Sequence, residues 1–204
     1  MALNFCNNNS LSAITSIPAA ISGGSLNLIS TQTASSSSSL SFTSGIDSTY
    51  KEYIFKYINC HPSVNIPHWT FQGSTNAGSS FGVTITSTNF NAYHAENDSE
   101  AVIEYVAPGD LAQSTNYQRL LKEFNYSDDG SVSGTLHLFE PSNTSFVKHF
   151  IATSQGMFGP TSSAYSWNQY VGGYFNTTSA IDAIDFKFSS GNIDSGVIKL
   201  YGVS

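Results

Sequence analysis

Side-chain character alternates with a period of two from residue 25 to the C-terminus, and this pattern constrains the fold more than any other feature. β-branched and aromatic residues recur at every second position within short segments, which glycine, proline, asparagine and aspartate separate. Such a pattern is typical of β-strands joined by turns. The clearest segment is residues 50–59 (YKEYIFKYIN), in which three tyrosine and phenylalanine residues alternate with Ile54, Lys56 and Ile58. Because both faces carry apolar side chains, we expect a central strand that is covered on each side.

The alternation predicts about ten strands. The segments with this pattern are residues 25–35, 50–59, 68–72, 83–93, 101–106, 133–140, 146–153, 169–177, 181–188 and 196–203. Residues 110–124 fit either a helix or a loop followed by a strand over 116–126. We favour the strand, because Asp128-Asp129-Gly130 is typical of a hairpin turn that leads into the next strand.

Two further turn signals complete the expected strand pattern. The serine tract at residues 35–39 is too polar for a core and predicts a loop. Residues 189–192 (SSGN) predict a hairpin that joins the last two strands. In the first of these strands, three apolar residues alternate with Asp185 and Lys187, so we expect one dry face and one wet face.

The expected architecture is a single all-β domain, an antiparallel two-sheet β-sandwich. A length of 204 residues suits one such domain, and there is no repeat of fixed period. Within this class a jelly roll is our first choice, although the sequence does not fix the strand order. We assign the β-sandwich to residues 25–204.

Residues 1–24 differ from the rest and are predicted to form a short N-terminal arm or anchor. Four apolar residues recur there at helix-like spacing: Leu11, Ile14, Ile17 and Ile21. Pro18 interrupts the pattern and Gly23-Gly24 ends it. A short apolar arm of this kind packs on its own domain or on a neighbouring subunit, and we interpret it as an assembly anchor.

The charge content narrows the choice of partners. Only 10% of the residues are charged, against roughly 25% in ordinary globular proteins. The polarity comes instead from 35 Ser, 17 Thr and 17 Asn residues. The net charge of −7 and the scattered basic residues argue against nucleic acid as a partner. No apolar run is long enough to span a membrane, and the N-terminus lacks the features of a signal peptide, so we expect synthesis in a cytoplasm.

The sequence lacks the common motifs of catalytic, phosphate-binding and metal-binding sites. It has no Gly-x-Ser-x-Gly elbow, no His-Glu-x-x-His, no glycine-rich phosphate loop and no Cys-x-x-Cys pair. The five histidines are scattered, and Cys6 and Cys60 are too far apart in sequence for a typical metal pair. We expect two unreactive thiols, no metal, no cofactor and no enzymatic activity. A depolymerase would need a carboxylate pair, and the few acidic residues lie mostly near turns.

The abundance of aromatic residues suggests one hypothesis, a binding site for sugars. The chain has 11 Tyr, 14 Phe and 2 Trp residues, and most of the phenylalanines must belong to the core. Amphipathic aromatic rings often serve interfaces. Trp69 and Trp167 are therefore candidates for a platform on which a sugar ring stacks.

Five segments, read together, resemble structural proteins from tailed bacteriophages of marine bacteria. The segments are SLSFTSGIDSTYKEYIFKYINCHP (39–62), WTFQGST (69–75), DLAQSTNYQ (110–118), GTLHLFEPSNTSFVKHFI (134–151) and GGYFNTTSAIDAIDFKFSSGNIDSGVIKLYGV (172–203). The ending SGNIDSGVIKLYG is the most specific part. The resemblance covers most of the domain, and it carries no catalytic residues onto this chain.

The resemblance implies a protein of the virion surface that is synthesised in the host cytoplasm. It is compatible with a tail fibre, an appendage or a capsid decoration. The chain has no extended shaft, which favours a compact knob attached directly to the head, neck or tail. We expect a homo-oligomer that contacts other virion proteins; trimers are common for such knobs, but nothing in the residues requires one. The alternative is a receptor-binding tail-fibre module that recognises a host surface polysaccharide.

Overall fold

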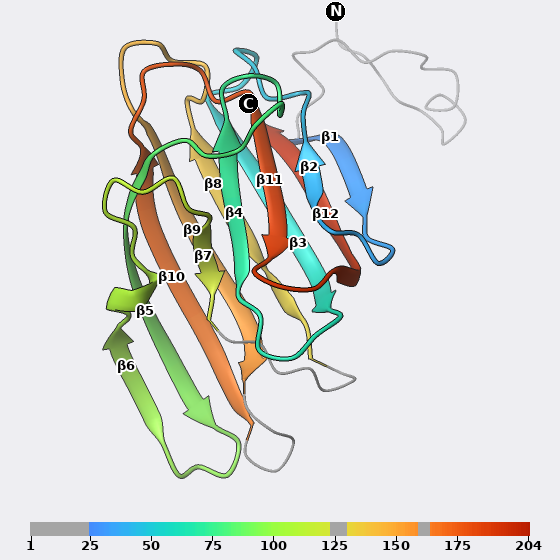
Figure 1. Ribbon diagram of the computed structural model, residues 1–204, viewed down its shortest axis with the longest axis vertical. Coiled ribbons are helices and arrows are strands. Elements are labelled where there is room, and N and C mark those ends of the chain that lie inside the picture. The colour runs from blue at the N-terminus through green and yellow to red at the C-terminus, as the bar shows by residue number, and fades with distance from the viewer. Residues whose placement is uncertain (1–24, 123–129, 159–163) are drawn as a thin grey trace, which may run out of the picture.

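The computed structural model describes residues 25–122, 130–158 and 164–204. Within these residues the chain forms 12 strands and one short 3₁₀ helix, and the strands are arranged in two antiparallel sheets that pack face to face (Figure 1). The prediction of an all-β, two-sheet sandwich is therefore confirmed. The predicted arm, with Leu11, Ile14, Ile17 and Ile21, lies outside the described residues.

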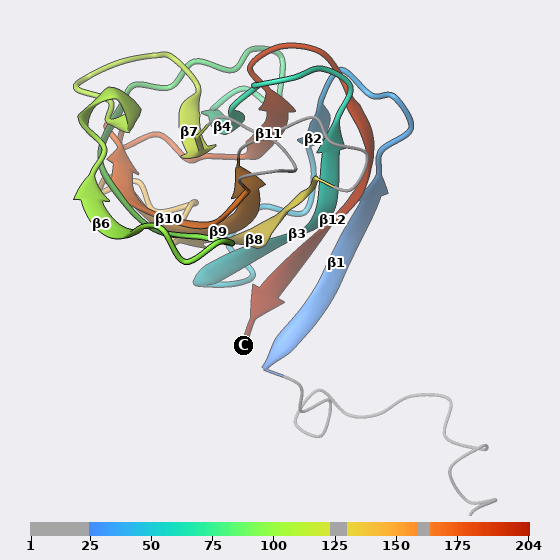
Figure 2. The same ribbon diagram turned by 90° about the horizontal axis from the view of Figure 1, so that it is seen from below.

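The large sheet contains 8 strands of the described chain, in the order β1-β12-β3-β8-β9-β10-β5-β6. In sequence order these strands are β1 (Leu26–Thr33), β3 (Glu52–Pro62), β5 (Ile85–Ala95), β6 (Ala101–Tyr105), β8 (Val132–Phe139), β9 (Lys148–Phe158), β10 (Tyr165–Phe175) and β12 (Ile193–Val203). The sheet curves strongly, so its concave side encloses the core (Figure 2).

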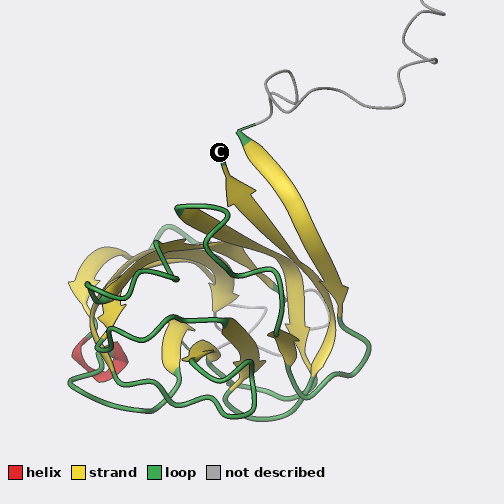
Figure 3. Ribbon diagram, turned by 90° about the horizontal axis from the view of Figure 1, so that it is seen from above, coloured by secondary structure: helices red, strands yellow, loops and turns green. Residues whose placement is uncertain are grey.

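The small sheet has 4 strands among the described residues, in the order β2-β11-β4-β7. They are β2 (Leu40–Phe42), β4 (Trp69–Ser74), β7 (Gln118–Leu121) and β11 (Ala183–Phe188). The helix η2 (Ala107–Gly109) lies between β6 and β7. Loops cover the upper end of the sandwich, where connections between the two sheets pass (Figure 3).

Most predicted strands are present, and one ambiguous segment is resolved. β7 (Gln118–Leu121) lies within the range 116–126 for which we favoured a strand, so the helix alternative is wrong for the described part of this segment. The expected hairpin turn at Asp128-Asp129-Gly130 lies largely outside the described residues. The serine tract forms a loop with one isolated bridge, from Ser37 to Ile193.

The expected hairpin between the last two strands does not exist. β11 belongs to the small sheet, where it pairs with β2 and β4. β12 belongs to the large sheet, where it pairs with β1 and β3. The turn residues at 189–192 do reverse the chain, but they also carry it from one layer to the other. A local turn signal cannot distinguish these two outcomes, because the partner of each strand is set by long-range contacts.

Aromatic side chains from both sheets fill the core around Phe186, which is fully buried. Its ring lies within 5.4 Å of Phe55 and 5.9 Å of Trp69, centroid to centroid. Phe71 and Phe42 are neighbours at 6.2 Å and 6.4 Å. Offset and edge-to-face contacts of this kind add to the stabilisation that burial gives, by about 0.5–1.5 kcal/mol per pair.

Two predictions about strand faces need correction. β3 is central in its sheet, but only its aromatic face is covered along its length: on the opposite face Ile54 is buried, whereas Ile58 is 42% exposed. No second layer of described residues covers that side of the large sheet. On β11, the apolar face is dry as predicted, but Asp185 is buried and accepts hydrogen bonds from Ser41 and Tyr117. The reason is that the loop carrying Tyr117 covers this carboxylate.

Candidate functional site

Trp69 does not form a sugar platform. Its side chain is fully buried on β4, where it stacks on Phe186 and contacts Phe188 at 4.8 Å and Tyr57 at 5.8 Å. A stacking platform must present a ring face to solvent, so the prediction for this residue is wrong. Trp69 points inward because it occupies a core-facing position of a strand whose six residues are all buried.

Trp167 is also unavailable for stacking. It lies on the concave side of β10 and is only 4% exposed. Tyr93 stacks on its ring at 4.4 Å with nearly parallel planes, and the ammonium group of Lys122 lies 5.1 Å from the ring centroid. The prediction of a ligand platform at this tryptophan is therefore wrong as well. The alternation Trp167, Gln169, Val171 on one strand face was a signal that this face points inward.

The cysteines and histidines form no metal centre in the part of the chain that is described. Across residues 25–122, 130–158 and 164–204, no three His, Cys, Asp or Glu side chains lie close enough to hold a metal ion. Cys60 is a buried free thiol, and burial raises its pKa to about 12. His137 instead pairs with Glu52, with 2.6 Å between its Nδ1 atom and Oε1 of the carboxylate. Cys6 lies outside the described residues.

Polar side chains buried between the sheets serve the architecture. Gln169 donates a hydrogen bond to the side-chain oxygen of Asn89 (2.9 Å), and it accepts one from the backbone N–H of Lys122 (2.7 Å). Gln118 accepts a hydrogen bond from Ser87 and donates one to the carbonyl of Gly109. These bonds attach β7 and the η2 segment to the concave side of β5 and β10. Because a buried amide without partners is costly, the contacts fix the position of this segment.

Lys148 is the one lysine in the described residues that is fully buried. Its ammonium group donates hydrogen bonds to the carbonyls of Phe146 (2.8 Å) and Thr177 (3.1 Å). Burial lowers its pKa from the usual value for lysine. The contacts tie the segment before β9 to the segment after β10, so we assign Lys148 a structural role.

The outer face of the large sheet carries the main exposed apolar surface. Eight large apolar side chains on its strands are exposed: Leu26, Leu28, Ile58, Phe90, Ile103, Tyr105, Ile151 and Tyr170. Surface patches of this kind mark interaction sites when they are contiguous. The exposure of Ile103 reaches 79% and that of Tyr105 reaches 62%, which are large fractions for such residues on a strand.

Four of these residues form a contiguous group, which we call the outer apolar patch: Phe90, Ile103, Tyr105 and Tyr170. Strand register places Tyr170 opposite Phe90, and Phe90 opposite Tyr105. The rings of Phe90 and Tyr170 stack at 4.9 Å with an interplanar angle of 11°. Ile103 projects on the same side, two residues before Tyr105. The sequence contained a signal for this patch. Phe90 shares its strand face with polar residues, which indicates that this face is exposed.

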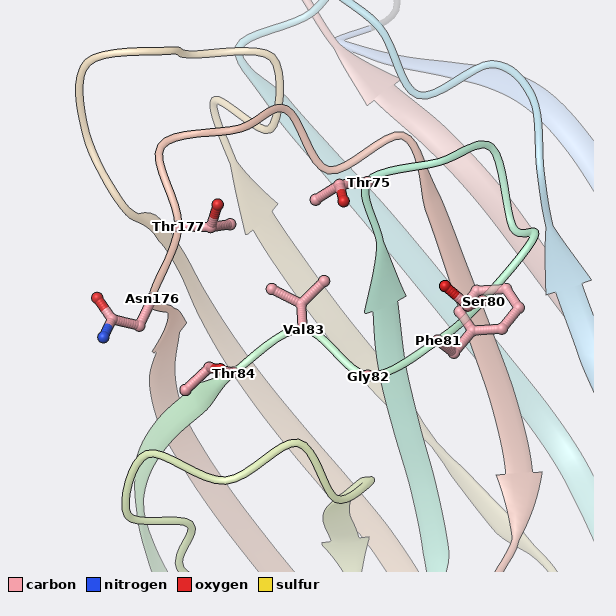
Figure 4. Close-up of a pocket in the computed structure, with 8 residues that line it drawn as sticks. All are labelled: Thr75, Ser80, Phe81, Gly82, Val83, Thr84, Asn176 and Thr177. Carbon is pink, nitrogen blue, oxygen red and sulfur yellow. The ribbon is translucent and has the colours of Figure 1, made fainter.

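A polar pocket lies at the upper end of the sandwich (Figure 4). It encloses about 330 Å³ between the β4–β5 connection and the residues that follow β10. Ser80 and Phe81 lie on one side, and Asn176 and Thr177 lie on the other. All eight lining residues are uncharged, so the pocket offers hydroxyl and amide groups without an acid, a base or a charge.

A second concave site lies on the outer face of the small sheet, and it differs from the first in being charged. It encloses about 390 Å³ and is lined by Asp110, Tyr117, Arg119 and Lys187 among other residues. We call it the charged groove. Neither this groove nor the pocket was foreseen from the sequence, because each brings together residues from segments that are far apart in sequence.

The chain matches no protein-family model, and neither a curated protein nor a solved structure shows significant similarity to it. In the described parts of the chain, no helix is long and apolar enough to cross a membrane.

Proposed function

We propose that this chain is a bacteriophage virion structural protein, a compact oligomeric knob that acts through protein–protein contacts. The observation that carries the proposal is the outer apolar patch. Phe90, Ile103 and Tyr105 are exposed side by side on a sheet face that no described element covers. Their position favours contact with a second protein surface, because burial of such residues is favourable by about 25 cal/mol per Å².

The surface chemistry supports assembly by contact. Only 10% of the residues are charged, and the described salt bridges are Lys51–Glu140, His94–Asp98 and His137–Glu52. A contact between surfaces of few charges has a small desolvation cost. In this proposal copies of the chain contact one another and other virion proteins on the virion surface, as a capsid decoration or as a tail or neck appendage. Threefold symmetry is one arrangement for the homo-oligomer.

We also propose that the sandwich is a jelly roll. The order β1-β12-β3-β8 within the large sheet and the order β2-β11-β4-β7 of the small sheet support this reading. From β1 to β4, each connection crosses from one sheet to the other, and so do β7–β8 and β11–β12, as in two interlocked Greek keys. The remaining four strands, β9, β10, β5 and β6, then extend one sheet and carry the outer apolar patch.

The arm at residues 1–24 is proposed to seat the knob on its partner. Four of its apolar residues recur at helix-like spacing: Leu11, Ile14, Ile17 and Ile21. Deletion of residues 1–24 would leave the sandwich folded and would prevent incorporation into particles. The knob would be made in the host cytoplasm and would join the particle during assembly.

Two substitutions in the patch test the contact function. Phe90→Ser and Ile103→Lys would each lower the oligomeric state, measured by size-exclusion chromatography with light scattering, because each removes exposed apolar area. Phe146→Ser is the matched control, since Phe146 is 68% exposed but lies in a loop outside the patch. A wild-type protein that stays monomeric at all concentrations, or patch variants that assemble like wild type, would contradict the proposal.

Antibody labelling of purified particles tests the location. Label over the head would identify a capsid decoration that stabilises the particle. Label confined to the tail would identify an appendage and would give more weight to host recognition. Absence of label from purified particles would contradict a virion protein.

A further inference from the structure

The strand β6 (Ala101–Tyr105) forms one edge of the large sheet (Figure 1). On one side it pairs with β5, and no described strand pairs with its other side. Four of its five residues are exposed, so this edge is accessible along its length. An accessible strand edge presents a row of backbone N–H and C=O groups that can pair with another chain.

The hydrogen bonds at the two ends of the β5–β6 ladder show which backbone groups point outward. The N–H of Val106 donates to the carbonyl of Asn89 (2.9 Å), and the N–H of Ala95 donates to the carbonyl of Glu100 (2.8 Å). Because the direction of the backbone groups alternates along an antiparallel ladder, every second residue from Glu100 to Val106 faces β5. The backbone groups that face the outer edge belong to Ala101, Ile103 and Tyr105.

Pairing of β6 with β6 of a second copy satisfies all of these groups in one antiparallel register. With Ile103 opposite Ile103 of the second copy, Ala101 lies opposite Tyr105. Each of these residues then donates one backbone hydrogen bond and accepts one. The register also places the large side chain of Tyr105 beside the small side chain of Ala101, so neighbouring side chains do not overlap.

The charge of Glu104 favours this register over the adjacent ones. In the register centred on Ile103, Glu104 lies opposite Val102. A shift of the centre to Glu104 would place two carboxylates directly opposite one another, about 5 Å apart at Cβ, and like charges in this position are destabilising. A shift of the centre to Val102 would place Tyr105 opposite Ser99, which lies outside the strand, so fewer outward groups would pair.

The opposite edge of the large sheet is less suited to such pairing. β1 has a register shift between Leu28 and Ser30, and a bulge twists an edge strand and interrupts its row of backbone groups. The ladder of β5 and β6, which lies wholly within the described residues, has no such shift. A second copy therefore meets a regular edge at β6 and an irregular one at β1.

Edge pairing would also join the outer apolar patches of the two copies. Ile103 and Tyr105 are 79% and 62% exposed, and Phe90 lies opposite Tyr105 in the strand register. The Tyr105 hydroxyl donates a hydrogen bond to Asp110, which holds the ring in place at the edge. In the paired sheet these side chains would lie next to those of the second copy, so burial of apolar area would add to the backbone hydrogen bonds.

We propose that two copies of the chain associate about a twofold axis between their Ile103 residues, with antiparallel β6 strands that join the two large sheets into one. This pairing specifies the contact of the proposed function and rests on it, since it uses the outer apolar patch. The shared edge of five residues is about 17 Å long at 3.4 Å per residue. Such a short edge gives a small interface, which is typical of weak association, and repeated contacts on a particle would act together.

Ala101→Pro in the full-length protein tests the backbone contact. Proline removes the outward N–H of residue 101 and leaves the bonds to β5 intact, because those bonds use the alternate residues. The side chains of the patch are unchanged. We expect the dimer dissociation constant, measured by analytical ultracentrifugation, to rise at least about 10-fold, since two symmetry-related hydrogen bonds are lost. Ala101→Ser is the matched control, because it keeps the N–H, and it should associate like wild type.

Single introduced cysteines test the register. The background is Cys6→Ser, and the native Cys60 thiol is buried. Ile103→Cys would bring two Cα atoms within about 5.5 Å at the axis, a separation that permits a disulfide. Ser99→Cys is the control, because Ser99 is also exposed but lies far from Ser99 of the second copy in this register. Under mild oxidation we expect the linked dimer to form at least about 10-fold faster from Ile103→Cys, since pairing raises the effective concentration of the thiols.

The possible results separate edge pairing from the contact function. If Ala101→Pro dimerises like wild type while Phe90→Ser does not, the copies meet through the patch and the edge pairing is wrong. Equal rates of disulfide formation from Ile103→Cys and Ser99→Cys would overturn the register, and this comparison decides the test if Ala101→Pro does not fold. A wild-type trimer would overturn the twofold pair. A wild-type protein that stays monomeric at all concentrations would contradict both the edge pairing and the contact function.

Discussion

Trp69 has the largest of the fully buried side chains in the described core. We expect its replacement by alanine to cause a severe loss of stability. A tryptophan buries roughly 150–250 Å², which corresponds to about 4–6 kcal/mol at 25 cal/mol per Å². That value is an upper bound, because the unfolded chain already buries part of this area. Substitutions of this kind usually cost about 3–5 kcal/mol. Since the free energy of unfolding of a domain is only about 5–15 kcal/mol, we expect Trp69→Ala to be at most marginally stable.

A second variant separates the volume of the side chain from its polarity. The indole nitrogen of Trp69 is buried and has no hydrogen-bond partner among the described residues, so Trp69→Phe loses no hydrogen bond. It keeps one ring against Phe186 and Phe188, and we expect it to cost about 1–2 kcal/mol. A difference between the two variants of about 2 kcal/mol or more would attribute the effect to the filled volume.

The assay is urea unfolding at 25 °C, followed by fluorescence. The chain has 2 Trp residues, so Trp167 is the sole tryptophan fluorophore in both variants. If Trp69→Ala stays within about 1 kcal/mol of wild type with an unchanged denaturant dependence, the assigned core is wrong. The result also matters for binding experiments, because lost sugar binding in Trp69→Ala would report unfolding and not the removal of a platform.

Two further predictions concern the thiol and the glycines. Burial raises the folded-state pKa of Cys60 from 9.0 to about 12, so stability should fall as pH rises between these values, by up to about 1.4 kcal/mol per pH unit. Cys60→Ala should remove this part of the slope in urea unfolding between pH 8 and 11, and an unchanged slope would contradict the burial of the thiol. A methyl group at Gly134 would overlap the carbonyl of Thr153 and the ring of Tyr57, whereas one at Gly172 would meet nothing within 4 Å. Gly134→Ala should therefore cost about 2 kcal/mol or more, and Gly172→Ala should stay within about 1 kcal/mol of wild type; equal melting temperatures would refute the assigned packing.

The candidate sites were predicted less well than the strands. A sugar platform needs an exposed ring, and aromatic composition does not give exposure. Trp69 and Trp167 both occupy inward positions, and the exposed rings are instead those of Phe90, Tyr105, Phe146 and Tyr170. The charged groove could not be predicted from the sequence, because Lys187 and Arg119 are far apart along the chain. They lie near each other only because their strands, β11 and β7, both pair with β4.

The sequence by itself determined the class of the fold. Alternation with a period of two is a local property, because successive side chains of a strand point to opposite faces whatever the strand pairs with. It therefore located most strands, and it placed Tyr53, Phe55 and Tyr57 on one buried face. The scarcity of charge and the absence of catalytic motifs were also visible without a structure.

Only the tertiary structure decided which layer each strand joins and which polar side chains are buried. The β11–β12 turn crosses between the sheets, and Asp185 is covered by a loop more than sixty residues away in sequence, at Tyr117. These features depend on contacts between distant segments, whose free energies are summed over the whole core. The local pattern shows which residues share a strand face, and only the packing of distant segments determines what each face contacts.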